Sequence, residues 1–552
     1  MTPNTNNPQQ ALAAFLLGFP FSGIVQNSIS TAEQSPYYGF YFQDDWRASN
    51  RLTLNLGLRY EFEAAYTERF DRFNRGFDAT VASPIEAQAL ANYRANPIPQ
   101  LPVADFHARG GLLFVGVGGQ PRGLTNIDRN NFAPRIGVAY KLTDRTVLRG
   151  GYGLFYGATT QLSEASLGFS INTPFVGAVN NVIPAGATLS NPFPAGLLVA
   201  PGSSLGTGTL LGSDISFVDP NRKQPFAHQY QLSIQQELPG HLLLDAAYVG
   251  ALGRDVAVNV QLNAIPLQFI QQARQTLVAT GVDILAQAVP NPFFRLVPAG
   301  ASLDRSTVDR GQLLRPFPQF TSVAQLNSSI GSYRYDAFQF KATRRFSEGF
   351  SLLTSYTFAK QLEKTRLLNV QDAELVKELS DFDLPHRLVV SSSYELPFGP
   401  GRRFLGNASG IGSKLLEGFQ LNAIYQAQSG LPLTVSNAAS TGQSAQLPEG
   451  ERSVDRWFDT TAFRRLERYE LVTTSRLSDV RSPGRNTFDL SLFKTTRITE
   501  GVRLQLRAEG FNLFNRSEFS SPVTNFDSPN FGRIQSTNLF NRQFQFGAKL
   551  LF

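Results

Sequence analysis

Apolar and polar residues alternate along several segments of this chain. The clearest segment runs from Arg51 to Glu63, where leucine, tyrosine and phenylalanine fill every second position and polar residues or glycine stand between them. A period of two predicts a β-strand with one apolar and one polar face. A tilted strand of about ten residues crosses a hydrocarbon core about 30 Å thick. The segment therefore predicts a membrane-crossing strand whose leucines face lipid.

The same alternation closes the chain at Arg542–Phe552. The aromatic and aliphatic residues on its apolar side include Phe544, Phe546, Leu550 and Phe552. The segment has the length of a bilayer-crossing strand, and it ends on an aromatic residue with nothing behind it. These two properties together favour the closing strand of a transmembrane barrel over a strand of a soluble domain.

Thirteen segments share this pattern, and short and long connections alternate between them. Short turns on one side and long loops on the other are typical of an up-and-down antiparallel barrel in an outer membrane. A soluble sandwich would have connections near four to six residues throughout. The predicted strands are Tyr37–Trp46, Arg51–Glu63, Phe132–Leu142, Thr146–Tyr156, Phe226–Leu238, His241–Gly250, Tyr333–Phe346, Phe350–Lys360, His386–Leu396, Gly418–Gln428, Arg485–Thr495, Val502–Asn512 and Arg542–Phe552.

The odd number of strands predicts a partial barrel. If Phe552 ends in the periplasm, counting back places residues 1–36 on an external loop before the barrel domain, residues 37–552. Single-chain bacterial barrels have even strand numbers, so we expect at least one further strand in a longer parent protein. The segment Met1–Gln10 also lacks the basic start of a secretory signal, which supports the same expectation.

Composition narrows the class of protein further. The longest apolar run, Ala11–Phe19, is far too short for a transmembrane helix. The absence of cysteine excludes disulfides and thiolate metal sites. The net charge of +7 is spread over turns and polar strand faces, so we expect no nucleic-acid partner.

Several segments resemble one known family in order along the chain. They read YYGFYFQDDWRASNRLTLNLGLRYEFE, NNFAPRIGVAYKLTDRTVLRGGYGLFYG, SYRYDAFQFKATRRFSEGFSLLTSYTFAK, DFDLPHRLVVSSSYELPFG and AEGFNLFNRSEF. They resemble the barrel of TonB-dependent outer-membrane receptors, and most of all the Oar-like branch. The resemblance covers roughly residues 11–552.

The resemblance implies a transport system in the outer membrane of a Gram-negative-type bacterium. Members of the family carry a plug domain and a TonB box, on which an inner-membrane energy complex pulls to move a large ligand. Neither is recognisable in this sequence, so TonB coupling is expected only in an intact parent that carries the plug. By the same resemblance, Phe552 with Phe544, Phe546 and Leu550 forms a signal read by the barrel-assembly machinery. Outer-membrane lipid and an unidentified ligand at the extracellular loops are the other expected partners.

Two further functions remain open beside uptake or export of a large ligand. The barrel could carry loops that bind other surfaces, as in an adhesion protein, or it could be a passive porin. Deleting the loops distinguishes the first alternative, because cell contact would be lost while uptake remained. No nucleophile stands beside a base in a recognisable motif, so we expect no enzyme activity.

The polar clusters in the sequence favour structural roles, and we expect neither a metal nor a cofactor. Asp381, Asp383 and His386 lie close together at the start of a strand, but no further ligand accompanies them. Asp44 and Asp45 are neighbours on a strand and point to opposite faces.

Two glycine-rich stretches and a basic pair are also predicted to be structural. Gly116–Gly119 lack the helix of a phosphate-binding loop, and Gly150, Gly151 and Gly153 lie inside a strand, where they permit bending. The pair Arg402–Arg403 is predicted to be a solvated connection rather than an anion site.

One helix is expected outside the strands. The segment Pro266–Val289 places Phe269, Ala273, Leu277 and Leu285 roughly on one side, which predicts a short helix in an external loop, packed on the barrel rim.

Overall fold

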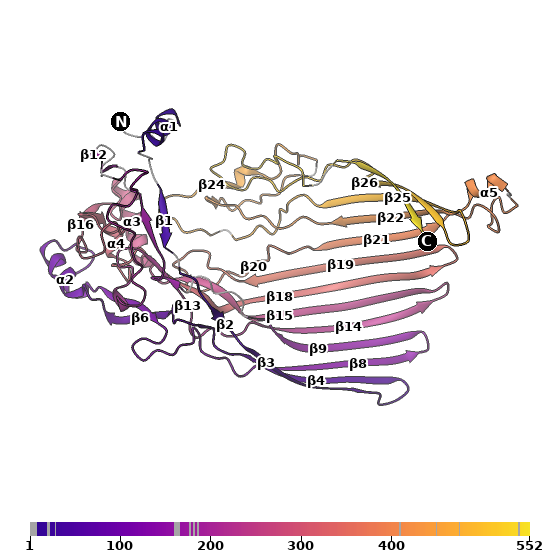
Figure 1. Ribbon diagram of the computed structural model, residues 1–552, viewed down its shortest axis with the longest axis horizontal. Coiled ribbons are helices and arrows are strands. Elements are labelled where there is room, and N and C mark those ends of the chain that lie inside the picture. The colour runs from indigo at the N-terminus through magenta and orange to yellow at the C-terminus, as the bar shows by residue number, and fades with distance from the viewer. Residues whose placement is uncertain are drawn as a thin grey trace.

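The structure is a computed structural model of the chain. It describes residues 8–18, 23–27, 29–158, 166–175, 178–179, 183–184, 187–407, 410–448, 450–473, 475–538 and 541–552. Part of the N-terminal segment 1–36, including most of Met1–Gln10 and the end of Ala11–Phe19, lies outside the described residues. Long strands run side by side through most of the molecule, and smaller elements gather at one end of them (Figure 1).

The long strands form one antiparallel sheet in which each strand pairs with the next along the chain. The sheet holds fifteen strands, two of which lie off its main path. The thirteen strands on the path are β3 (Tyr37–Trp46), β4 (Leu52–Glu63), β8 (Phe132–Thr143), β9 (Thr146–Tyr156), β14 (Phe226–Leu238), β15 (Leu242–Gln261), β18 (Ser322–Ser347), β19 (Phe350–Lys364), β21 (His386–Glu395), β22 (Phe419–Gln428), β25 (Arg485–Arg497), β26 (Arg503–Phe511) and β27 (Gln543–Leu551).

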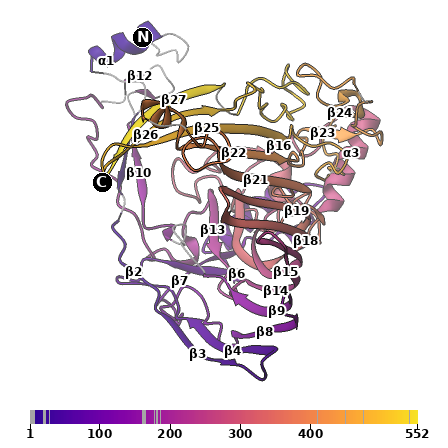
Figure 2. The ribbon, with the colours of Figure 1, turned by 90° about the vertical axis from the view of Figure 1, so that its right-hand side faces the viewer.

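These are the strands that the alternation predicts, and an all-β, up-and-down barrel sheet is confirmed. Strands β3 and β27 stand at the two ends of the path and are not paired with each other in the described residues. Seen along the strands, the sheet curls without meeting itself between β3 and β27 (Figure 2). The prediction of a partial barrel of about thirteen strands is therefore also confirmed.

The cross-strand register explains why alternation produces two chemically different faces. Leu56 pairs with Ile136, and Ile136 pairs with Tyr152, so one face collects large apolar side chains. One position away, Asn55 pairs with Gly137, and polar residues and glycine collect on the other face. We call these the outer and the inner face. Ile136 on the outer face is 49% exposed. Contact of such an apolar side chain with lipid is favourable, whereas its contact with water is not.

Two strands continue beyond the length that a membrane needs. The sequence predicts strands ending at Gly250 and beginning at Tyr333, but β15 reaches Gln261 and β18 begins at Ser322. Register shifts between β15 and β18 interrupt the period of two beyond Gly253. An unpaired extra residue moves every later side chain to the opposite face, so alternation cannot reveal the extension.

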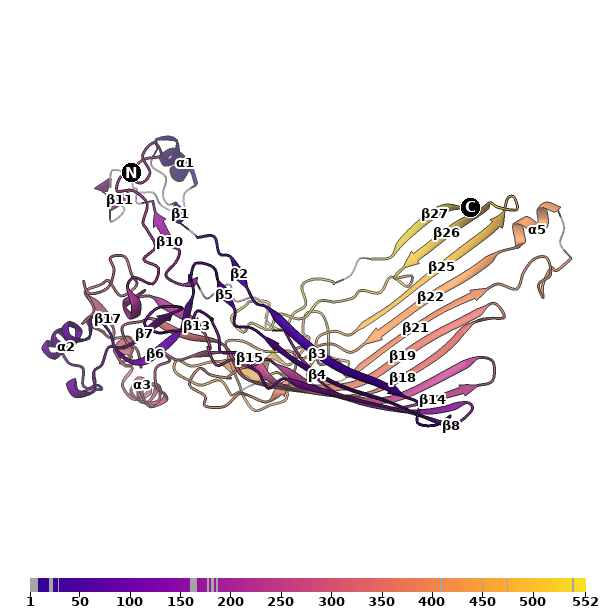
Figure 3. The same cartoon turned by 60° about the horizontal axis from the view of Figure 1, so that its bottom comes forward.

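The extensions carry a compact layer built from the long loops, which we call the loop layer. Strand β13 lies at the end of the sheet where the long loops gather and pairs parallel to the start of β18 (Figure 3). Hydrophobic residues from three long loops share one buried core, and Tyr469 of a fourth loop packs against it. The helices and strands of the long loops are β1 (Ile24–Asn27), β2 (Glu33–Gln34), β5 (Thr67–Glu68), β6 (Asn74–Ala82), α2 (Glu86–Ala95), η1 (Val103–Asp105), β7 (Arg109–Phe114), β10 (Ile171–Pro174), β11 (Ala178–Val179), β12 (Ile183–Pro184), η3 (Gly206–Gly208), β13 (Asp214–Val218), α3 (Leu267–Thr280), β16 (Ala288–Pro290), β17 (Thr307–Asp309), α4 (Arg310–Leu313), β20 (Glu378–Leu379), β23 (Ala438–Ser440), η4 (Thr460–Ala462) and β24 (Phe463–Arg465).

The helix expected within Pro266–Val289 is present, but it is shorter and packs differently. Helix α3 begins after Pro266 and ends at Gly281, which has φ 72° and is well suited to the left-handed cap. It buries Ile270 and Ala273 in the core of the loop layer. Leu285 joins the same core from beyond the helix end.

Two short helices complete the described elements: α1 (Pro8–Leu16) and α5 (Gly410–Leu416). Helix α5 lies in the connection between β21 and β22, at the end of the sheet opposite the loop layer. Within the described part of the chain, each helix is too short or too polar to cross a membrane.

Candidate functional site

A hollow opens on the inner face of the sheet, across β3, β4, β8, β9 and β14. Its volume is about 430 Å³. Most of its lining alternates with outer-face residues and therefore belongs to the inner face. The inner-face residues that line it are Gln43, Asn55, Gly57, Arg135, Gly137, Gly151, Gly153, Phe155, Gln229, Gln231 and Val249.

Glycines in register make this hollow. Gly137 pairs with Gly151 across β8 and β9, while Gly57 and Gly153 both pair with Arg135. A strand position without a side chain leaves the backbone itself exposed at the bottom of the hollow. A Cβ added at Gly151 would meet only the Gln231 side chain, whose Cγ and Nε2 lie at 3.4 Å. Gly151 and Gly153, two of the three β9 glycines that the sequence predicts as bending positions, thus also supply the space of the hollow.

The lining offers hydrogen bonds and one cation. The Arg135 guanidinium lies 4.7 Å from the centre of the Phe155 ring, which holds the arginine against the wall. The amide side chains of Asn55, Gln229 and Gln231 both donate and accept hydrogen bonds. This combination suits a polar or anionic group and contains no nucleophile–base pair.

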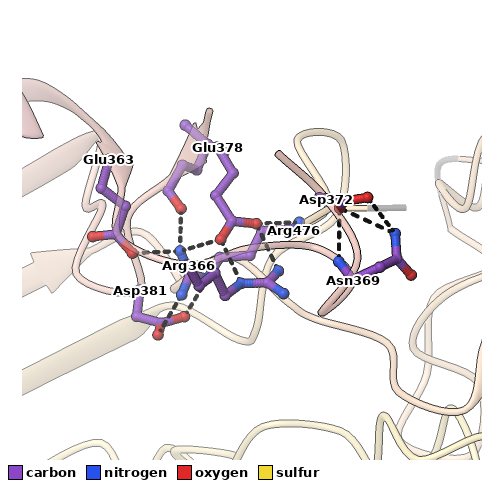
Figure 4. Close-up of polar contacts among 8 residues, drawn as sticks. Glu363, Arg366, Asn369, Asp372, Glu378, Asp381 and Arg476 are labelled. Carbon is purple, nitrogen blue, oxygen red and sulfur yellow. Dashed lines mark hydrogen bonds and ion pairs between the residues drawn. The ribbon is translucent and has the colours of Figure 1, made fainter. Parts of the chain in front are cut away.

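A second polar site holds the loops together beyond the outer end of β19 (Figure 4). The Arg476 guanidinium donates to Glu363 Oε1 at 2.6 Å and to the Leu379 carbonyl at 2.7 Å. It also lies 3.1 Å from Glu378 and 2.5 Å from Asp381. Arg366 reaches the same Glu378 carboxylate with two hydrogen bonds of 2.7 and 2.8 Å.

The two residues at the centre of this cluster are buried. The side chain of Arg476 is 7% exposed and that of Glu378 is 1% exposed. Burial by itself lowers the pKa of Arg476, but the hydrogen bond to Glu363 and the charges of Glu378 and Asp381 outweigh it, so the pKa is raised. Arg476 is therefore charged at every physiological pH. Its role is to fasten the loop around residues 466–484 to the loop after β19.

The structure separates the three residues considered as metal ligands. Asp381 pairs with Arg476, whereas Asp383 pairs with Arg481 at 2.5 Å and accepts from the Gln361 backbone at 2.6 Å. His386 Nδ1 lies 2.8 Å from the Tyr356 hydroxyl. Across the described ranges, no three histidine or carboxylate side chains converge on a point where a metal could bind.

The other candidates take structural contacts as well. Asp45 accepts a hydrogen bond from Asn55 across the β3–β4 pair, and Arg402 pairs with Glu395 at 2.8 Å. Phe544, Phe546, Leu550 and Phe552 are all more than half exposed. The role of these four residues in assembly stays a prediction.

A third cluster joins α3 to the segment 464–470, and we call it the α3 ion cluster. Arg274 on α3 lies 3.5 Å from Glu467 and 3.8 Å from Glu470. Arg464 holds Glu470 at 2.5 Å, and this hydrogen bond lowers the pKa of Glu470 to about 2. Just beyond α3, Asp283 accepts from the Tyr469 hydroxyl at 2.7 Å.

The α3 ion cluster should open in acid. The ordinary pKa of Glu470 is 4.5, and in the folded protein it is lowered to about 2. The ionised carboxylate therefore stabilises the cluster fully above pH 4.5, and this stabilisation is lost as the pH falls to about 2. Spin labels on Val278→Cys and Arg465→Cys should give a narrow distance distribution at pH 6 that broadens through this range. In Glu470→Gln the distribution should already be broad at pH 6. A narrow, pH-independent distribution in both proteins would contradict this assignment.

Comparison with known proteins decides the family. The family model described as "Outer membrane beta barrel domain" matches residues 1–545. The chain belongs to this family. It is an outer-membrane barrel protein, and the apolar outer face of its sheet contacts lipid.

Several solved outer-membrane structures match the chain at low identity, while no curated protein matches it. They include the outer membrane transporter YddB of Escherichia coli, with 10% identity, a TM-score of 0.42, and coverage of 94% of this chain and 54% of that one. The pyoverdine receptor FpvA of Pseudomonas aeruginosa PAO1 has 10% identity, a TM-score of 0.39, and coverage of 95% and 43%. The ferric-catecholate import receptor Fiu of E. coli has 12% identity and a TM-score of 0.38, with coverage of 94% of this chain and 45% of that one. This outer-membrane barrel chain spans about half the length of these three proteins, and likeness at this level adds no detail to its site.

Proposed function

We propose that the chain forms the barrel of a TonB-dependent, Oar-like transporter or receptor that takes up or exports a large ligand. The observation that carries this proposal is the hollow on the inner face. A wall that only supports surface loops needs no in-register glycines and no cation held against it. A wall that a ligand passes or docks on benefits from both, because amides and a guanidinium provide exchangeable hydrogen bonds.

The loop layer supports the same proposal. It is rigid enough to shape a ligand entrance, since its core residues are almost fully buried and come from loops far apart in the sequence. The proposal keeps TonB coupling for an intact protein that carries a plug. It leaves the chemical identity of the ligand to experiment, and the lining favours a polar or anionic ligand.

Filling the hollow should stop transport. Gly151→Leu places a side chain in it, whereas Gly150→Leu places the same side chain on the outer face, where the nearest atom to a Cβ is 3.9 Å away. We expect the inner substitution to lower uptake by at least about tenfold, which corresponds to about 1.4 kcal/mol of lost interaction. The outer substitution should leave uptake within about twofold of the wild type.

Uptake is measured with radiolabelled ferric siderophores, oligosaccharides and peptides in cells that express the protein from its native gene. The ligand that the wild type accumulates is then used for both variants, with and without an uncoupler. Equal losses in Gly150→Leu and Gly151→Leu would show that the hollow does not contact the ligand.

The alternative function is a surface interaction barrel whose loops bind partners. The loop layer favours it, because a folded platform of this kind can present a surface. Deleting α3 and the connection up to β16 tests it. Loss of cell contact with unchanged uptake would establish the adhesion function, whereas loss of uptake would support the transporter.

A further inference from the structure

The connection between β21 and β22 differs from the other short connections at its end of the sheet. It carries α5, which projects beyond the ends of β21 and β22 on the side opposite the loop layer (Figures 1 and 3). In an outer-membrane barrel, tight turns lie on the periplasmic side and long loops lie outside. Helix α5 therefore lies at the periplasmic rim.

Lysine contacts hold α5 at the outer-face side of this rim. Lys494 pairs with Phe419 and with Leu506, so its side chain belongs to the lipid-facing side of the sheet. Its ammonium group lies over the Phe419 ring at 4.6 Å and donates to the Lys414 and Glu417 carbonyls at 2.8 and 3.0 Å. These are carbonyls of the last turn of α5 and the residue after it, where a helix has no internal partners.

Apolar side chains project from the helix that is held in this way. Ile411 is 81% exposed and Leu415 is 62% exposed. They are four residues apart, so they share one face of α5. In the same connection, Phe404 and Leu405 are 48% and 58% exposed. In water, exposure of this much apolar surface is unfavourable.

The charge of the connection suits phospholipid. Residues 396–418 contain three basic residues, Arg402, Arg403 and Lys414, and one acidic residue, Glu417. The Arg403 guanidinium lies 5.6 Å from the centre of the Phe404 ring, so a cation and an apolar side chain stand together. Basic residues beside an exposed apolar helix face are the pattern of a segment that lies in a membrane interface.

We propose that α5 is an interfacial anchor that inserts Ile411 and Leu415 into the periplasmic leaflet of the outer membrane. The occupant of its apolar face is the phospholipid at the boundary between headgroups and acyl chains, about 5–10 Å below the surface. Lys494 is a positioning residue that aims the helix at the lipid. The inference rests on membership of the outer-membrane barrel family and not on what the barrel transports.

Spin labels test the depth of α5 directly, because the chain contains no cysteine. Single labels are placed on Ile411→Cys and Leu415→Cys. The matched control is Asp144→Cys, in the rim turn between β8 and β9, where the native side chain is 96% exposed. Each protein is folded into vesicles of phosphatidylethanolamine and phosphatidylglycerol, and a β-sheet circular dichroism spectrum confirms that the strands have formed.

Relaxation by oxygen and by a water-soluble nickel complex then reports depth. The ratio of oxygen to nickel relaxation should be several-fold higher at Ile411 and Leu415 than at Asp144. Equal ratios at all three sites would overturn the anchor, and would leave a periplasmic protein as the partner of this face.

The positioning role of Lys494 has its own readout. Lys494→Met keeps an apolar stem on the outer face but cannot donate to the last turn of α5. The label at Ile411 should become more mobile and its oxygen-to-nickel ratio should fall toward that of Asp144. An unchanged ratio would overturn the positioning role.

Discussion

Replacing Arg476 with methionine should release two loops from the outer end of β19. The substitution leaves the Glu363 carboxylate and the Leu379 carbonyl without the guanidinium donor, and it leaves Glu378 with Arg366 and the backbone N–H of residue 476. Breaking a buried ion pair from one side costs about 3–5 kcal/mol, because the remaining charge stays desolvated. We expect trypsin to cleave after Arg366 and Lys377 on the order of a hundredfold faster in Arg476→Met, as local opening becomes that much more populated.

A surface ion pair provides the control for this experiment. Arg465 pairs with Asp527 at 2.7 Å, but the Arg465 side chain is 72% exposed. Exposed pairs contribute about 0–1 kcal/mol, so Arg465→Met should change the cleavage rate by no more than a few-fold. If the two variants were cleaved at the same rate, burial of the Arg476 cluster would not be what holds these loops.

Replacing Phe293 with alanine should loosen the loop layer while the barrel strands stay intact. Phe293 is fully buried in the core of that layer, with its ring centre 6.0 Å from that of Phe106. Truncating a buried phenylalanine costs about 3–5 kcal/mol, since transfer energy is lost and a cavity remains. Hydrogen exchange followed by mass spectrometry should show faster exchange in β7 and α2. Peptides from β9 and β14 should exchange as in the wild type.

The control for this experiment is a substitution in the loop layer that leaves no buried cavity. Val278 on α3 is 76% exposed, so Val278→Ala should leave exchange in β7 and α2 unchanged. Faster exchange throughout the barrel strands in Phe293→Ala would show that the loop layer and the sheet unfold as one unit, and would contradict their independence.

The barrel strands were predictable because a single local property defines them. One face meets lipid and the other does not, so the period of two in segments such as 51–63 reports both the strand and its orientation. The register in the structure follows from the same property, since a slip of one residue would turn Leu56 and its neighbours inward.

The loop layer and the Arg476 cluster could not be predicted because their contacts join distant residues. Asn92 donates to the Pro292 carbonyl across 200 residues, and Arg476 meets Glu363 across 113. Nothing near either residue in the sequence marks its partner. The hollow was only partly predictable: the sequence shows the glycines of β9 but not the space that they leave. Their alignment with Gly137 and Gly57 requires the register of three strands.

The length of β18 has a mechanical consequence. Its 26 residues extend to about 85 Å at about 3.3 Å per residue, although about ten residues suffice to cross the membrane. The same continuous backbone is therefore part of the wall in the membrane and part of the platform above it. A force applied to that platform from outside therefore reaches the wall along the backbones of β15 and β18. Displacing the platform must therefore also move or bend β15 and β18, which continue into the wall.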